Sequence, residues 1–150
     1  MQAVIFIGVQ ASGKSTFFRE RFFDTHVRIN LDMLKIRPRE KIILDACLES
    51  HQNFVVDNTN PTIEDRKRYI LPAKAANYEV VGYYFDSKIA ASLQRNQERL
   101  EKQRIPDGGI RSTYYKLQMP SLNEGFDKLY YVKIDPQGTF VVEEWVDDPH

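Results

Sequence analysis

The sequence predicts an α/β fold in which a mostly parallel sheet carries helices on both faces. Stretches suited to strands alternate with stretches suited to helices along a chain of 150 residues. The first apolar run, "VIFI", leads directly into a glycine-containing turn and then a helix-like stretch. Because the sequence shows no internal repeat, low-complexity segment or linker, we expect one domain over residues 1–150.

The first predicted elements follow from apolar runs and their punctuation. Residues 3–8 are almost all apolar and predict a buried strand, and residues 14–23 predict the helix after it. "VRIN" predicts a short strand. Residues 32–50 predict a helix that Pro38 interrupts or restarts, because proline lacks the backbone donor that a helix interior needs.

The middle of the chain predicts a second buried strand and a helix with its own start signals. "NFVVDNTN" is apolar and then ends in polar residues. Pro61 suits the first turn of the following helix, and Asn60 suits its N-cap. Glu64 and Asp65 then lie near the positive end of the helix dipole, where acidic residues are favoured.

The last third of the chain predicts two more strand–helix alternations. "YEVVGYYF" predicts a third strong strand, residues 87–99 a helix, and "RIPDGG" a loop. A short helix follows at 112–117, where Tyr114 and Tyr115 either stack on a base or, as we expect, pack beneath a lid. "KLYYVKI" and "GTFVVEEW" predict strands on either side of a "DPQG" turn, which can form a hairpin at one edge.

Polar clusters follow three of the predicted strands. They are the loop at 8–15, Asn30 with Asp32, and the run from Asp57 to Asn60. In parallel α/β sheets, ligands bind outside the carboxyl ends of the strands. We therefore expect the three clusters to meet in one crevice.

The loop after the first strand, "GVQASGKS", matches the phosphate-binding pattern G-x-x-x-x-G-K-[ST]. Glycine permits close approach of the main chain, so that successive N–H groups and the positive end of the helix face an anion. Lys14 then reaches the β- and γ-phosphates of ATP, and Ser15 ligates Mg²⁺; the alternative is a flexible turn with a solvated lysine. The residues expected to contact the nucleotide are Gly8, Gln10, Ala11, Ser12, Gly13, Lys14, Ser15 and Thr16.

Two carboxylates predict the chemistry beside these phosphates. Asp32 follows a strand, where it can accept a proton from a hydroxyl that attacks the γ-phosphorus; alternatively it caps the next helix. Asp57 ends a strand, a position suited to an acid near Mg²⁺, or to a hydrogen-bonded turn residue. We expect Ser15 and Asp57 to be the metal ligands.

The segment from about 95 to 112 predicts a small helical lid over ATP. Arg95 and Arg99 are four residues apart and share a helix face. A guanidinium fork can hold the negative charge that phosphoryl transfer spreads over the moving group. Arg111 belongs to the same segment, and we expect it to contact the substrate. The alternative is an exposed helix whose arginines pair with neighbouring glutamates.

Taken together, these clusters resemble the kinase domain of phage and bacterial polynucleotide 5′-kinases, within the wider P-loop kinase group. The likeness spans residue 4 to about 118, through "GVQASGKST", "INLDMLK", "DNTNPTIEDR", "LQRNQER" and "RIPDGGIRSTYYKL". The resemblance implies a P-loop NTPase fold in which Lys14 and Ser15 serve ATP and Mg²⁺. It also implies that Asp32 is the general base and that Arg95 and Arg99 act from the lid.

The resemblance also implies a substrate side of the site. Lys35 stands where the family often has an arginine that contacts the phosphate of the substrate, and lysine is a point charge instead of a fork. Asp57 matches the aspartate of the family's turn, and Asn58 follows it. We therefore expect Lys35, Asp57, Asn58 and Arg111 on the substrate side.

These observations predict an ATP-dependent kinase whose acceptor is the 5′-hydroxyl of an oligonucleotide. A kinase for a small hydroxyl compound, such as a nucleoside, sugar or antibiotic, stays open as an alternative. So does an ATP-binding regulatory ATPase without an acceptor of its own. The two lid arginines disfavour the last, because a transfer enzyme needs to exclude water.

Composition limits the partners and the compartment. The 21 basic and 21 acidic residues balance, so we expect contact with nucleic acid to be local, as at a strand end. Cys47 is the only cysteine and cannot form an internal disulfide. Without a signal peptide or an apolar run long enough to span a membrane, we expect a cytoplasmic protein with no membrane contact and no obligate protein partner.

Overall fold

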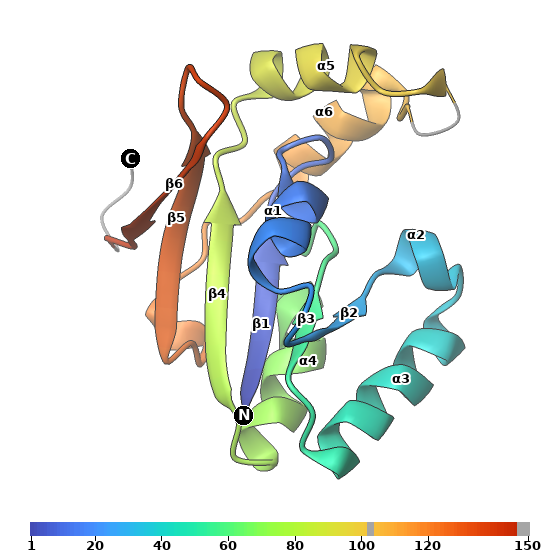
Figure 1. Cartoon of the computed structure of the whole chain (residues 1–150), viewed down its shortest axis with the longest axis vertical. Coiled ribbons are helices and arrows are strands. Elements are labelled where there is room, and N and C mark those ends of the chain that lie inside the picture. The colour runs from blue at the N-terminus through green and yellow to red at the C-terminus, as the bar shows by residue number, and fades with distance from the viewer. Residues whose placement is uncertain (102–103, 147–150) are drawn as a thin grey trace.

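The computed structural model describes residues 1–101 and 104–146, and within them the strands form one sheet of six (Figure 1). The strand order is β2-β3-β1-β4-β5-β6. The first five strands are parallel, whereas β6 is antiparallel to β5 and forms the expected edge hairpin. The strands are β1 (Gln2–Ile7), β2 (Val27–Ile29), β3 (Phe54–Val56), β4 (Glu79–Phe85), β5 (Lys128–Ile134) and β6 (Phe140–Glu144).

Helices cover both faces of the sheet, because successive side chains of a strand point to opposite faces. On β1, Ala3 and Ile5 join a core with α3 and α4, while Val4 and Phe6 join a second core with α1. This confirms the predicted α/β class. The helices are α1 (Lys14–Arg21), α2 (Leu31–Leu34), α3 (Arg37–Ser50), α4 (Ile63–Ala75), α5 (Ile89–Gln97), α6 (Asp107–Lys116) and the 3-10 helix η2 (Leu122–Glu124).

The start of α4 differs from the prediction. Thr62 is the N-cap, and it forms a reciprocal capping box with Asp65. The expectation that Asn60 caps the helix and that Pro61 lies in its first turn is wrong. Asn60 is instead held against β1, where its side-chain amide donates to the Phe6 carbonyl at 2.8 Å.

Helix α6 begins earlier than predicted. The "DGG" of the expected loop forms the first turn of the helix, after Pro106 in an extended conformation. Tyr115, expected to pack beneath the lid, is 79% exposed, and Tyr114 is 41% exposed, so packing is the wrong interpretation for Tyr115. Of the predicted lid at 95–112, residues 102 and 103 lie outside the described residues.

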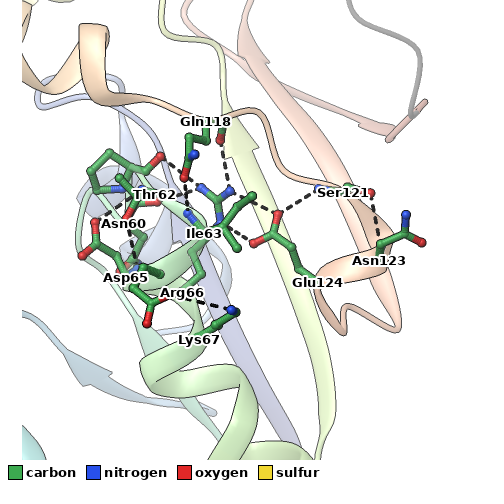
Figure 2. A network of polar contacts seen from close by, with 12 residues as sticks. Asn60, Thr62, Ile63, Asp65, Arg66, Lys67, Gln118, Ser121, Asn123 and Glu124 are labelled. Carbon is green, nitrogen blue, oxygen red and sulfur yellow. Dashed lines mark hydrogen bonds and ion pairs between the residues drawn. The ribbon is translucent and has the colours of Figure 1, made fainter.

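A buried ion pair fixes the turn after β3 (Figure 2). The Arg66 side chain is fully buried and donates to both carboxylate oxygens of Glu124, at 2.7 and 3.1 Å. It also donates to the carbonyls of Asn60 and Gln118, each at 3.0 Å. The Gln118 N–H in turn donates to the Pro61 carbonyl at 2.7 Å. Arg66 thus joins the polar turn after β3 to the chain that leads into β5.

We expect Arg66→Ala to lower the free energy of unfolding by about 3–5 kcal/mol, because it leaves the Glu124 carboxylate buried without its partner. Urea denaturation followed by circular dichroism measures the change. The matched control is Lys67→Ala, since Lys67 is the next residue on α4 and its ion pair with Glu64 is exposed; it should stay within about 0.5 kcal/mol of the parent protein. A loss below about 1 kcal/mol for Arg66→Ala would contradict the assignment.

Candidate active site

The loop between β1 and α1 has the backbone geometry of an anion cradle. Gly13 adopts a φ of 101° and precedes the first turn of α1. A side chain there would be strained at this φ, and its Cβ would lie 3.0 Å from the Phe140 ring, which would have to shift. The loop therefore lies directly before a helix N-terminus, where main-chain N–H groups bind anions.

Lys14 is buried within this loop. Its ammonium group donates to the carbonyls of Gly8 at 3.0 Å and Val9 at 2.7 Å. Burial lowers the pKa of Lys14 to about 8; the Asp57 carboxylate opposes this shift, and the Arg99 guanidinium adds to it. Lys14 is thus a desolvated cation, and an anion that enters the loop can neutralise it.

A compact polar triangle lies beside Lys14. Ser15 donates from its hydroxyl to Asp57 Oδ2 at 3.0 Å, and Arg28 donates to the same carboxylate oxygen at 2.9 Å. Arg28 also donates to the Ser15 hydroxyl at 3.0 Å. Sequence reasoning missed Arg28, although a single charged residue inside the short strand "VRIN" was a signal that could have singled it out.

The turn that carries Asp32 is held by two asparagines. Asn30 caps α2 by accepting from the Met33 N–H at 2.9 Å, and Asn58 accepts from the Leu31 N–H at 2.9 Å. The hypothesis that Asp32 is the helix cap is therefore wrong. Asp32 is exposed, and its carboxylate forms no hydrogen bond or ion pair with any residue that the structure describes. It is available to a ligand.

A second buried cluster supports this turn from behind. The Asn58 amide donates to Glu40 Oε2 at 3.0 Å and to the Tyr69 hydroxyl oxygen at 3.2 Å. Glu40 is buried and also accepts from Arg37 at 2.7 Å. The amide oxygen and the amide nitrogen of Asn58 thus both form hydrogen bonds within the protein. Contact between Asn58 and a substrate stays a prediction. Sequence reasoning missed Glu40 and Tyr69.

The expected convergence of the three polar clusters is confirmed. Asp32, Lys14 and Arg99 border one cavity of about 230 Å³ at the carboxyl ends of the strands. The cavity is lined by Gln10, Ala11, Lys14, Ser15, Asn30, Leu31, Asp32, Asp57, Asn58, Thr59, Arg99 and Ile105.

Other predicted residues lie outside this cavity. Lys35 and Arg111 are exposed and do not line it. Arg95 donates to the Ala11 carbonyl at 2.6 Å, so it holds the loop from the side and borders a separate cavity with Ser12. Thr16 is exposed, and its hydroxyl accepts from Arg19.

Helices α5 and α6 lie together beyond the carboxyl ends of β1 and β4 (Figure 1). Asn96 on α5 is fully buried and pairs with both the N–H and the carbonyl of Ile105, a residue of the cavity wall. Gln10 of the loop donates to the Thr113 hydroxyl on α6 at 3.0 Å. Both helices are therefore tied to the phosphate loop and its cavity; the role of Asn96 was not predicted.

The described residues contain no group of three or more His, Cys, Asp or Glu side chains that could hold a metal ion. Any metal in the crevice would therefore rely on a mixed set of hydroxyl and carboxylate oxygens. As for membranes, none of the helices in residues 1–101 and 104–146 is long and apolar enough to cross one.

The sheet order and the strand–loop–helix define an α/β P-loop NTPase fold, and solved structures agree. A gluconokinase from Sinorhizobium meliloti superposes with a TM-score of 0.63 at 15% identity, over 88% of this chain and 82% of that one. Kti12 from Chaetomium thermophilum in complex with ADP-AlF3 superposes with a TM-score of 0.62 at 15% identity, over 89% of each chain. At these identities the likeness concerns the fold alone.

Sequence comparison is more specific. The chain is 30% identical over 130 residues to a bifunctional polynucleotide phosphatase/kinase of Schizosaccharomyces pombe, covering 83% of this chain and 32% of that protein. It is 27% identical over 156 residues to an Acanthamoeba polyphaga mimivirus protein with the same bifunctional description, covering 99% and 36%. No family model matches. The chain spans about a third of the length of these relatives; in sequence it resembles polynucleotide phosphatase/kinases, and in fold it is a P-loop NTPase.

The lowered pKa of Lys14 generates a pH prediction for anion binding. Above about pH 8 the free protein loses the Lys14 proton, which a bound triphosphate needs, so affinity should fall by up to about tenfold per pH unit. Calorimetric titration with a non-hydrolysable ATP analogue between pH 7.5 and 9.5 measures it. Lys14→Gln, which does not titrate, should bind weakly with a flat profile. A flat profile for the parent protein would refute the assignment.

Proposed function

We propose that the chain is an ATP-dependent kinase that transfers the γ-phosphoryl group of ATP to the 5′-hydroxyl of an oligonucleotide. The observation that carries the proposal is the unpartnered Asp32 carboxylate, which borders the same cavity as the phosphate loop. The similarity to bifunctional polynucleotide phosphatase/kinases supports the acceptor class.

The loop residues supply the ATP site. The main-chain N–H groups of the loop and the N-terminus of α1 bind the phosphates. Lys14 turns from the Gly8 and Val9 carbonyls toward the β- and γ-phosphates, which compensate its buried charge. Arg99 borders the cavity from the lid side and neutralises charge on the transferred group.

The residues of the crevice fit Mg²⁺, which suits hard oxygen ligands. Ser15 and Asp57 would hold the ion, because the Ser15 hydroxyl oxygen and Asp57 Oδ2 are neighbouring oxygens 3.0 Å apart. When bound, Mg²⁺ offsets phosphate charge and orients the γ-phosphate. In this structure the Arg28 guanidinium donates to the same two oxygens, so it would compete with the ion for them.

Asp32 acts on the acceptor. Its carboxylate accepts the proton of the 5′-hydroxyl as that oxygen attacks the γ-phosphorus, while the bond from the γ-phosphorus to the β,γ-bridging oxygen breaks and ADP leaves. Asn30 and Asn58 position the turn that carries Asp32, and Lys14 and Arg99 hold the negative charge on the group in transit. Arg95 keeps the loop in shape through the Ala11 carbonyl. Lys35 and Arg111, exposed outside the cavity, are left to contact the parts of a substrate that extend from it.

A screen for transfer of radiolabelled γ-phosphate tests the proposal. The acceptors are 5′-hydroxyl DNA and RNA oligonucleotides, nucleosides and sugars, with a reaction that lacks acceptor. Label on oligonucleotides supports the proposal. Label on small compounds alone, or hydrolysis alone, overturns it in favour of a small-molecule kinase or an ATPase.

Asp32→Asn should lower turnover by about 10²–10⁴-fold, because the amide cannot accept the hydroxyl proton. Nucleotide affinity should stay within about twofold, since Asp32 makes no contact that holds the loop. Steady-state kinetics and calorimetry measure the two effects. The control is Asp24→Asn, an exposed acid after α1. Unchanged turnover in Asp32→Asn would refute the base assignment.

Arg99→Ala should lower turnover by about 10²–10³-fold, because it removes a cation that the transition state uses. The loss of turnover should be far larger than any loss of folding stability, which the melting temperature measures. Arg68→Ala, at an exposed arginine on α4, is the matched control for loss of a positive charge. If Arg99→Ala changes only the melting temperature, the lid assignment is wrong.

A further inference from the structure

One face of α6 exposes aromatic rings that the fold does not use. Ile110 is the residue of this helix that enters the core, and Thr113 faces the phosphate loop. Tyr115 is 79% exposed, and the ring of Tyr114 meets it edge to face with centroids 5.7 Å apart. An exposed ring braced by a second ring is a preorganised surface for stacking.

The same face is positively charged. Arg111 lies four residues before Tyr115, which places the two on one side of the helix, and Lys116 follows Tyr115. Neither cation forms a hydrogen bond or an ion pair within the described parts of the chain. The acid of α6, Asp107, lies in its first turn, more than two turns from Tyr115. An exposed aromatic ring with a free cation on the same face suits a base with its adjoining phosphate.

The helix begins at the active site. Ile105 lines the cavity that contains Asp32 and Arg99, and α6 starts two residues later. Thr113, two residues before Tyr115, accepts a hydrogen bond from Gln10, which also lines this cavity, so a strand that leaves the cavity can reach Tyr115.

We propose that the face formed by Arg111 and Tyr115 binds the single-stranded part of the acceptor that follows the end receiving the phosphoryl group. A base stacks on Tyr115, and Arg111 pairs with a phosphate. A duplex does not offer an unstacked base, so the site selects single strands. This inference rests on the proposed function and narrows its acceptor to a strand of several nucleotides.

The test compares 5′-hydroxyl acceptors of two and eight nucleotides in steady-state kinase assays with saturating ATP. The parent protein should show a KM about tenfold lower for the longer acceptor. Tyr115→Ala should raise the KM for the longer acceptor about tenfold and leave kcat within about twofold. Tyr115→Phe, which keeps the ring, should keep the parent KM. Fluorescence anisotropy of the labelled octanucleotide without ATP should show weaker binding by Tyr115→Ala than by the parent protein and Tyr115→Phe.

The matched control is Phe23→Ala, which removes a 69% exposed aromatic side chain after α1 and should leave both KM values unchanged. Equal KM values for the two acceptors, or a Tyr115→Ala variant that behaves like Phe23→Ala, would overturn this inference while the proposed function stands. If neither oligonucleotide accepts label, the proposed function fails and the inference falls with it.

Discussion

The buried carboxylate of Asp57 is the constraint around which the crevice is built. A charge at the end of a central parallel strand is stable there only if donors and cations surround it. Ser15 from the phosphate loop and Arg28 from β2 donate to its side chain, and Asn30 donates to its carbonyl. Asp57 thus connects the nucleotide loop, the neighbouring strand and the turn that presents Asp32. The groups that stabilise its charge therefore hold the ATP side and the acceptor side of the proposed site in position relative to each other.

Much of the fold could be predicted from local pattern. Continuous apolar runs mark β1 and β4, and the loop between β1 and α1 has a motif whose spacing is itself structural. Predictions failed where distant contacts outweighed local preference. Asn60 is a good helix cap in isolation, but its amide is used by the Phe6 carbonyl 54 residues away. Two consecutive glycines suggest a loop, yet Gly108 and Gly109 lie inside the first turns of α6.

The site shows the same division. Several residues that line the cavity, such as Asp32 and Asp57, come after strands and bear recognisable chemistry, so topology alone predicted that they meet. The residues that hold them in place, Arg28, Glu40 and Asn96, were not predicted, because their partners are distant or backbone groups and leave no local pattern. Arg28 reaches a carboxylate 29 residues away, and Glu40 an amide 18 residues away. A buried charge needs a compensating partner, but the sequence pattern does not show which segment supplies that partner.

The double hydrogen bond between Asn96 and the main chain of Ile105 has a mechanical consequence. It joins the end of α5 to the segment that leads into α6, so we expect the two helices to move as one unit. Arg99 follows α5 and lines the cavity, and Tyr115 is exposed on α6, so both residues belong to this unit. A long strand bound at Tyr115 would therefore restrict the motion of Arg99 at the cavity.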